Sequence, residues 1–256
     1  MSLIHPLAIV HTEASIADSA TIGPFCHIGK NVTIGEDTCL RSHVVIDGIV
    51  SIGKECTIYP FVSIGLEPQD VKYQGEESKV TIGDNNIIRE GVTIHRGTRH
   101  GHLETKIGNN NMFMAYSHVA HDCTVGNGVI LIHLAIVGGH VTVEDFAVLG
   151  AYAGVHQFCS VGKYSFTGAC SAVTKDVVPY SFVSGDRAKY FGINSVGLHR
   201  HNFNQKTIEI IKSALTTLNK MDTPIALETL MEKWPDIPEI QTIIHFIKNS
   251  KRGIIK

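Results

Sequence analysis

Aliphatic side chains recur every six residues along most of the chain. The unbroken first run occupies nine positions: Ile16, Ile22, Ile28, Ile34, Leu40, Ile46, Ile52, Ile58 and Ile64. A helix repeats near 3.6 residues and a strand repeats at 2, so a period of six fits neither element alone. It is typical of a parallel β-helix that turns a corner every six residues and sends one aliphatic side chain inward from each side. Three sides make a coil of about 18 residues, and neighbouring coils are expected to pair ~4.8 Å apart.

Glycine often follows the aliphatic residue of the repeat, as in Gly23, Gly29 and Gly35. Glycine adopts backbone angles that other residues avoid. The sequence therefore predicts that these glycines supply the angles of the corners.

Two polar segments interrupt the repeat. The first, residues 66–79, separates Ile64 from Ile82, and because the repeat keeps its phase we expect this segment to replace two sides of the coil. The second, residues 95–106, separates Ile94 from Ile107 and shifts the phase by one residue. The repeat then continues to Val173. Long excursions from a compact repeat body are usually functional or disordered.

A different pattern follows the repeat, which fades near residues 178–180. Asn204 is expected to cap a helix that ends near Asn219, and two more helices are predicted to begin at Thr223 and at residues 236–238, the last ending near Asn249. Proline near the start of both later helices suits a first turn. The sequence predicts a mainly β protein, with a β-helix over residues 1–186 and a C-terminal helical domain over residues 187–256.

Composition narrows the class of protein. The net charge of −2 gives no support to nucleic-acid binding. No apolar stretch is long enough for a membrane span, and the first residues lack the pattern of a signal peptide. The six cysteines have no C-x-x-C spacing and are expected to be small buried residues of a reducing compartment, which favours a cytoplasmic protein.

Histidine gathers in the later coils. The chain has 15 histidines, and the informative ones are His95, His118, His121, His133, His140 and His156. Adding one coil of about 18 residues to His121 gives Gly139, and adding a second gives Gln157. These three residues are therefore expected to stack in one column. His140 and His156 would flank the column, and His118 could point from the same corner.

Three kinds of chemistry suit such a cluster. An imidazole can act as a general base near neutral pH, and Asp122 could orient His121 for that role. The backbone N–H of Gly139, one coil beyond His121, could stabilise a developing oxyanion. Alternatively, three histidines could bind zinc, or the rings could bind phosphates or sugar hydroxyls.

Several segments together make the pattern more specific. They are PQDVKYQGE (68–76), IHRGT (94–98), AHDCTVGN (120–127), GGHV (138–141), VHQFCSVG (155–162) and FGINSVGLHRHNF (191–203). The chain resembles, over nearly its whole length, the bacterial UDP-N-acetylglucosamine O-acyltransferase family. The resemblance implies a left-handed β-helix, an exception to the usual handedness of crossovers. It also implies a homotrimer with active sites between subunits, an acyl carrier protein thioester as acyl donor, no cofactor or metal, and the first step of lipid A biosynthesis.

The resemblance also implies roles for individual residues. His121 resembles the general base that takes the proton from the glucosamine 3-hydroxyl, Asp122 its supporting carboxylate, and the Gly139 N–H the oxyanion donor. Residues that resemble groups lining the nucleotide-sugar and acyl sites are His95, His118, His140, His156 and Gln157. Residues that resemble sugar and acyl contacts from the first excursion are Gln69, Asp70 and Lys72. Asn194 and Arg200 resemble contacts to the nucleotide and its phosphates, for which an arginine fork is suited.

Some positions depart from the family pattern. His201 follows Arg200 where a second basic residue is common, which weakens an expected phosphate or carrier contact. Arg187 stands where many members have histidine, and Val196 replaces a more polar residue. Both positions lie near the nucleotide in the family, so we expect the nucleotide contacts there to differ. Ala169 lies in the region that limits acyl length, and we hypothesise a shorter or differently placed acyl chain. The basic tail KRGIIK could contact the acidic carrier protein, although a solvated terminus is the simpler expectation.

Other functions remain open at this point. One is N-acylation of an amino-sugar nucleotide, although the N-acyltransferases usually have an extra N-terminal domain and the repeat here begins by Ile4 and Val10. A second is a zinc enzyme of the carbonic anhydrase type with His95, His118 and His121 as ligands. A third is a non-catalytic solenoid that presents a flat binding face.

Overall fold

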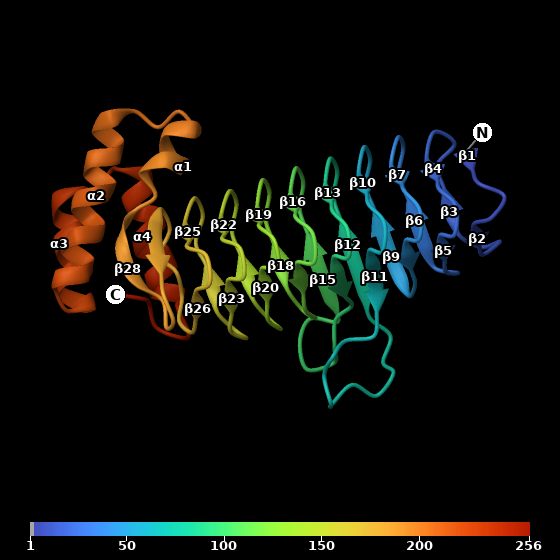
Figure 1. The fold of residues 1–256 in the computed structure, drawn as a ribbon. Coiled ribbons are helices and arrows are strands. Elements are labelled where there is room, and N and C mark those ends of the chain that lie inside the picture. The colour runs from blue at the N-terminus through green and yellow to red at the C-terminus, as the bar shows by residue number, and fades with distance from the viewer. Residues whose placement is uncertain (1–2) are drawn as a thin grey trace.

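The structure, a computed structural model, describes residues 3–256. Figure 1 shows an elongated body of short strands with helices at its C-terminal end, as the sequence predicted. The strands of the described residues form three sheets that run along the body, and their strands pair in parallel except for the last pair of one sheet. The chain visits sheet A, sheet B and sheet C in turn, so that each coil contributes one strand to each sheet. We call the turns that lead from sheet B to sheet C the B–C edge, and name the A–B and C–A edges in the same way.

The strands of sheet A are β1 (Leu3–Ile4), β4 (Thr21–Ile22), β7 (Cys39–Leu40), β10 (Thr57–Ile58), β13 (Ile87–Ile88), β16 (Met112–Phe113), β19 (Ile130–Leu131), β22 (Val148–Leu149), β25 (Phe166–Thr167), β27 (Ser181–Ser184) and β28 (Lys189–Ile193). Those of sheet B are β2 (Ile9–Val10), β5 (His27–Ile28), β8 (Val45–Ile46), β11 (Ser63–Leu66), β14 (Thr93–His95), β17 (His118–Val119), β20 (Ile136–Val137), β23 (Gly154–Val155) and β26 (Ala172–Val173). Those of sheet C are β3 (Ser15–Ile16), β6 (Val32–Ile34), β9 (Ile49–Ile52), β12 (Lys79–Ile82), β15 (Glu104–Ile107), β18 (Thr124–Val125), β21 (Thr142–Val143) and β24 (Ser160–Val161).

Strand pairing confirms the predicted coil of 18 residues. Ile22 pairs with Leu40, and Val119 pairs with Val137. The residues of the six-residue repeat form the core, in which Ile22, Ile64 and Phe113 are at most 1% exposed.

Each side of the coil sends two residues inward, not the single residue that we expected. The second position lies two residues before the aliphatic one and mostly holds side chains no larger than valine, such as Ala20, Cys26, Val32, Thr38, Ser117 and Cys123. A small residue here lets the larger aliphatic side chains of the three sides meet in the centre. The prediction that the cysteines are buried is confirmed for four of them, whereas Cys39 is half-buried and Cys170 is exposed.

The prediction that the repeat glycines supply the backbone angles of the corners is wrong. Gly23 and Gly108 do not have positive φ angles; left-handed backbone occurs instead three residues after the aliphatic residue, mostly at residues other than glycine, such as Phe25 (φ 58°). The glycines are needed because the next coil lies very close. A Cβ added at Gly23 would lie 2.6 Å from the carbonyl oxygen of Arg41, and one added at Gly108 would lie 2.6 Å from that of Gly126.

Both excursions leave the body at the B–C edge. The first lies between β11 and β12 and the second between β14 and β15, so the loops comprise residues 67–78 and 96–103. The first loop does not replace two sides, because Ile64 and Ile82 lie on adjacent sheets. Ile58 pairs with Ile88, 30 residues apart in place of 18, so the first loop inserts 12 residues at a single corner. Figure 1 shows the two loops projecting together from one side of the body.

The C-terminal part contains α1 (Ser195–Arg200), α2 (Gln205–Lys220), α3 (Thr223–Lys233) and α4 (Pro238–Asn249). The predicted cap is confirmed, since Asn204 Oδ1 accepts a hydrogen bond of 2.9 Å from the Thr207 N–H. The sequence did not predict α1 or the antiparallel hairpin of β27 and β28. This hairpin continues sheet A across residue 187, and the division at residue 186 stays a prediction. Between Leu3 and Lys256, no helix has the length and apolar character required to cross a membrane.

The C-terminal tail closes the end of the β-helix. The Asp176 N–H donates to the Gly253 carbonyl, and the Ile255 N–H donates to the Asp176 carbonyl, each at 2.9 Å. Ile255 is 8% exposed and joins the core of the β-helix. The tail is therefore not a solvated terminus, although Lys251, Arg252 and Lys256 remain exposed.

Candidate active site

The B–C edge brings the histidine cluster and both excursions together. His121 follows β17, Gly139 follows β20 and Gln157 follows β23, so the predicted column runs along this edge over three successive coils. The same edge carries the loops of residues 67–78 and 96–103.

His121 and Asp122 are paired although they are neighbours in the chain. Asp122 is the third residue of its corner and has a left-handed backbone (φ 59°). Its Oδ2 lies 2.8 Å from His121 Nδ1, and the two side chains are 0% and 7% exposed respectively. The corner geometry of the coil therefore makes this pair.

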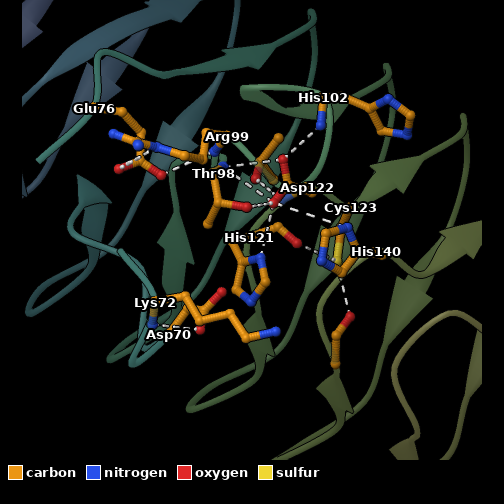
Figure 2. Close-up of polar contacts among 12 residues, drawn as sticks. Asp70, Lys72, Glu76, Thr98, Arg99, His102, His121, Asp122, Cys123 and His140 are labelled. Atoms are coloured by element: carbon orange, nitrogen blue, oxygen red, sulfur yellow. Dashed lines mark hydrogen bonds and ion pairs between the residues drawn. The ribbon is translucent and has the colours of Figure 1, made fainter. Parts of the chain in front are cut away.

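The Asp122 carboxylate has further donors from the second excursion, as Figure 2 shows. The Thr98 N–H lies 3.0 Å from both oxygens, Thr98 Oγ1 donates to Oδ2 at 2.7 Å, and the His102 N–H donates to Oδ1 at 2.8 Å. Burial alone would raise the pKa of Asp122, but the hydrogen bonds from His121, Thr98 and His102 outweigh it and lower the pKa to about 2. Asp122 is thus ionised at neutral pH. The neutral His121 ring must then carry its proton on Nδ1, which leaves a lone pair on Nε2.

Gly139 lies directly against the imidazole of His121. A Cβ added at Gly139 would lie 2.7 Å from both Cε1 and Nε2 of His121. Among residues 3–256, the Gly139 N–H has no acceptor, whereas the adjacent N–H groups of Gly138 and His140 donate to Val155 and His121. Other corners, such as the one at His133, also leave this N–H free. What distinguishes Gly139 is that its free N–H stands beside a buried imidazole.

Three more histidines surround the pair. The His140 ring lies edge-on to that of His121, with centroids 4.9 Å apart, and stacks on Phe158. His118 Nδ1 lies 2.6 Å from Thr93 Oγ1, and its ring is edge-on to that of His95. Burial lowers the pKa of His118 to about 4, and burial also lowers the pKa of His95 and of His140. These three rings are therefore neutral at pH 7.

One buried nitrogen of this group lacks a partner. His95 is 6% exposed, and its Nδ1 has no hydrogen-bond partner within the described part of the chain. An unpaired buried nitrogen is costly unless a bound molecule or water satisfies it. Nδ1 of His95 is therefore a candidate contact for a bound molecule or water.

The predicted substrate residues of the first excursion lie near the cluster. Figure 2 shows Asp70 and Lys72 on the loop beside His121. Asp70 is close enough to His140 for its charge to act on the pKa of that ring. Gln69 and Lys72 are exposed, as are His156 and Gln157 on the last coils of the column.

Three predicted residues lie elsewhere in the same chain. The side chain of Asn194 caps α1, since Oδ1 accepts from the Gly197 N–H and Nδ2 donates to the Tyr164 carbonyl. Arg200 is the last residue of this helix. The next residue, His201, contacts Tyr164 and so holds the helix against the C–A edge. Ala169 is exposed on the A–B edge, after β25. A single chain does not bring these residues to His121.

The departures from the family pattern also have definite places. His201 packs on Phe146 and Tyr164, with ring centroids 4.8 and 5.1 Å apart, and therefore has a packing role in place of a free basic group. Val196 is 60% exposed. Arg187 lines a cavity of about 330 Å³ whose other cations are Lys175, Lys189 and Lys256.

Sequence reasoning missed Thr98 and His102, the backbone and hydroxyl donors to Asp122. Almost every residue has a backbone N–H, so residue types give no signal for such donors. Only the position of the loop could have revealed them. It also missed Lys175, which stands one coil beyond Gln157 and extends the column to the C-terminal end.

The zinc alternative finds no support in the geometry. Within residues 3–256, the one group of three side chains whose ligand atoms converge is His121, Asp122 and His140, all within 4.8 Å, and not His95, His118 and His121. The oxygens of Asp122 already accept hydrogen bonds from Thr98, His102 and His121.

The chain is similar to known proteins over its whole length. Residues 13–48 and 104–139 match the model of the bacterial transferase hexapeptide, and residues 176–255 match that of UDP-N-acetylglucosamine O-acyltransferase, domain 2. The acyl-[acyl-carrier-protein]--UDP-N-acetylglucosamine O-acyltransferases of Saccharophagus degradans and Thermodesulfovibrio yellowstonii are 50% and 48% identical to this chain over 258 residues, with 100% of each chain covered. The structure of LpxA from Acinetobacter baumannii superposes with a TM-score of 0.97 at 41% identity, covering 99% of this chain and 100% of that one. These matches confirm the left-handed parallel β-helix. The chain belongs to the UDP-N-acetylglucosamine O-acyltransferase family.

Proposed function

We propose that this protein transfers a fatty acyl chain, 3-hydroxylated in our expectation, from acyl carrier protein to the 3-hydroxyl of UDP-N-acetylglucosamine, the reaction that begins lipid A biosynthesis. His121 is the general base and the Gly139 N–H is the oxyanion donor. The observation that carries this proposal is the contact of the His121 ring, oriented by Asp122, with the Gly139 backbone on the next coil.

The geometry supports a simple sequence of proton and group transfers. Nε2 of His121 takes the proton of the sugar hydroxyl as the oxygen attacks the thioester carbon. The carbonyl oxygen becomes an oxyanion, which the Gly139 N–H stabilises. The carbon–sulfur bond then breaks, the thiolate of the carrier takes the proton from His121, and the ester remains on the sugar. The charge of Asp122 stabilises the imidazolium that forms between these steps.

The positions of Asn194 and Arg200 favour an assembly. These residues lie at the C–A edge, whereas His121 lies at the B–C edge. If Asn194, Arg200 and His121 all contact one substrate, the C–A edge of one copy must lie against the B–C edge of another. Three copies arranged in this way close a ring, in agreement with the homotrimer implied by the resemblance. In a trimer the sugar site is formed by His121 from one subunit and Asn194 from its neighbour.

The basic C-terminal end of the column suits the carrier protein. Lys175 stands on the coil beyond Gln157 and lines a cavity of about 330 Å³ with Arg187, Lys189 and Lys256. No acidic side chain lines this cavity. Lys175 is three coils from His121, or ~14 Å at the usual strand spacing. A carrier with an acidic surface and a phosphate on its prosthetic arm would be attracted to this cluster of cations. The cluster is a local feature, because the net charge of the whole chain is −2.

The reaction is tested by product analysis. Purified protein is incubated with UDP-N-acetylglucosamine, or with an analogue that has an amino group at position 3, and with a series of acyl carrier protein thioesters. We expect an ester of UDP-N-acetylglucosamine, detected by mass spectrometry, and a preference for shorter chains because Ala169 adds a side chain at the length-limiting region. Product from the amino analogue alone would support the N-acylation alternative and contradict the proposal. A preference for the longest chains would contradict the role given to Ala169.

Assembly and carrier docking have separate tests. Light scattering of the purified protein should give three times the mass of one chain, and a monomer that retains full activity would contradict the shared site. Lys175→Glu should raise KM for the acyl carrier protein thioester and leave KM for the sugar nucleotide unchanged. Lys206→Glu, an exposed change at the start of α2 at a side chain with no hydrogen bond or ion pair to any residue from Leu3 onward, is the matched control. Equal KM values for the two variants would exclude the docking role.

A further inference from the structure

The two excursions are fastened to each other by a carboxylate that the reaction does not use. Glu76 Oε1 accepts from the Arg99 N–H and Oε2 accepts from the Gln74 N–H, both at 2.9 Å. The Arg99 guanidinium adds an ion pair at 3.6 Å, and the side chain of Glu76 is 8% exposed. Figure 2 shows this contact between the loops. Glu76 therefore joins a residue of its own loop to a residue of the other loop.

Arg96 makes a second connection between the loops. Its Nη2 and Nε lie 2.7 and 3.1 Å from Tyr73 Oη, and its Nη1 donates to the Gly65 carbonyl at 3.1 Å. The side chain is 17% exposed. A planar guanidinium directs donors to both groups from one rigid fork, whereas a lysine offers a single ammonium on a flexible stem. Arg96 thus binds both the end of β11, just before the first loop, and Tyr73 in the middle of that loop.

The same short stretch reaches the catalytic pair. Thr98 lies between Arg96 and Arg99, and its N–H and hydroxyl both donate to Asp122. Asp122 in turn binds Nδ1 of His121. Residues 96–99 therefore connect the first loop on one side with the Asp122–His121 pair on the other.

The turn with the predicted substrate residues Asp70 and Lys72 ends at Tyr73, the residue that Arg96 binds. The Lys72 N–H donates to Asp70 Oδ1, and the Tyr73 N–H donates to the Asp70 carbonyl, both at 3.0 Å. Asp70 and Lys72 are thus part of a turn whose last residue is held by Arg96. Movement of Tyr73 would move this turn relative to His121.

We propose that Glu76 and Arg96 are positioning residues for the sugar nucleotide, which hold the turn of Asp70 and Lys72 at a fixed place relative to His121. This inference deepens the proposed function and rests on it for the identity of the substrate. We call the contacts of Glu76 with Arg99 and of Arg96 with Tyr73 the clamp. Without the clamp, the turn must become ordered when the substrate binds, which weakens the affinity. The His121–Asp122 pair and the Gly139 N–H remain, so the chemical step is retained.

The test compares two adjacent glutamates. Glu76→Gln keeps the size of the side chain but places an amide NH₂ against one of the two backbone N–H donors. Glu77 is exposed and has no hydrogen bond or ion pair to any residue from Leu3 onward, so Glu77→Gln is a matched control for charge and position. Hydrogen bonds to charged groups typically change an equilibrium about tenfold to a hundredfold. We expect Glu76→Gln to raise KM for UDP-N-acetylglucosamine by about that factor, with kcat and its pH profile within about threefold of the parent.

A second variant and a second measurement make the result decisive. Tyr73→Phe removes the hydroxyl that Arg96 holds and should raise the same KM, even if Glu76→Gln folds poorly. Hydrogen exchange at the Gln74 and Arg99 amides should be faster in Glu76→Gln than in Glu77→Gln. Equal KM and equal exchange in the two glutamine variants would overturn the inference, as would a fall in kcat with KM unchanged. If the parent protein shows no acyl transfer but exchange is faster in Glu76→Gln, the proposed function fails while the clamp stands.

Discussion

Gly139 packs its Cα against the imidazole of His121, on the neighbouring coil of the β-helix. The contact is so close that a Cβ at Gly139 would lie 2.7 Å from Nε2, the nitrogen that carries the free lone pair. Because His121 is also held at Nδ1 by Asp122, the ring is fixed from two sides. One consequence is that the coil itself places the proposed base beside the proposed oxyanion donor.

Gly139→Ala should therefore inactivate the enzyme without unfolding it. The backbone at Gly139 has no positive φ, and the equivalent corner position of the A–B edge is occupied by Ala151, so the fold accepts alanine there. The methyl group must displace the His121 ring, and we expect kcat to fall by roughly 10²-fold or more. Circular dichroism and steady-state kinetics check this, with Ala151→Gly as the control. Normal turnover in Gly139→Ala would show that the ring position does not matter.

Asp122→Asn should lower kcat by roughly 10²–10⁴-fold. An amide at this position can accept fewer hydrogen bonds than the carboxylate and no longer favours the Nδ1–H form of His121. It also places NH₂ near the Thr98 and His102 N–H donors, so the loop of residues 96–103 should exchange its amide hydrogens faster. Kinetics and hydrogen exchange measure the two effects. A variant with normal kcat would mean that Asp122 only fixes the loop.

His118 should make the folded state sensitive to mild acid. Burial lowers its pKa to about 4 in the folded protein, whereas an unfolded histidine titrates near 6.5. The unfolded chain therefore binds a proton first as the pH falls. This contribution to stability is complete above about pH 6.5 and is lost progressively as the pH falls to about 4. The loss between pH 7 and pH 5 is about 2 kcal/mol.

Denaturant unfolding at pH 7 and pH 5, at one protein concentration, measures this effect. The loss of unfolding free energy between the two pH values should be smaller in His118→Gln than in the parent protein. His27→Gln is the matched control, because His27 also faces outward from sheet B but is exposed. An identical loss in all three proteins would contradict the assignment.

The repeat alone predicted most of the fold, because each coil obeys the same rule. Ile22, Leu40 and Ile58 pair as expected, and the column of His121 and Gly139 follows from the same spacing. The helix capped by Asn204 was predicted because a polar cap before an apolar stripe is a local signal. These features depend on neighbours or on a fixed period, so one sequence suffices to find them.

Features that depend on particular contacts were not predictable. The role of the glycines was misjudged because the distance between coils, not the backbone angle, excludes a side chain at Gly23. The donors to Asp122 are mainly backbone groups of the second loop, whose path the repeat does not determine. The β27–β28 hairpin and the tail at Ile255 join distant segments, and no period connects Asp176 with Gly253.

The most direct test of the account is the turnover number of His121→Ala with UDP-N-acetylglucosamine and an acyl carrier protein thioester. His133→Ala, an exposed histidine at the equivalent position of the A–B edge, is the matched control. We predict that His121→Ala loses roughly 10²–10⁴-fold in kcat while its circular dichroism and assembly are unchanged, and that His133→Ala keeps normal turnover. A His121→Ala enzyme that turns over as fast as the control would contradict the assignment of the general base.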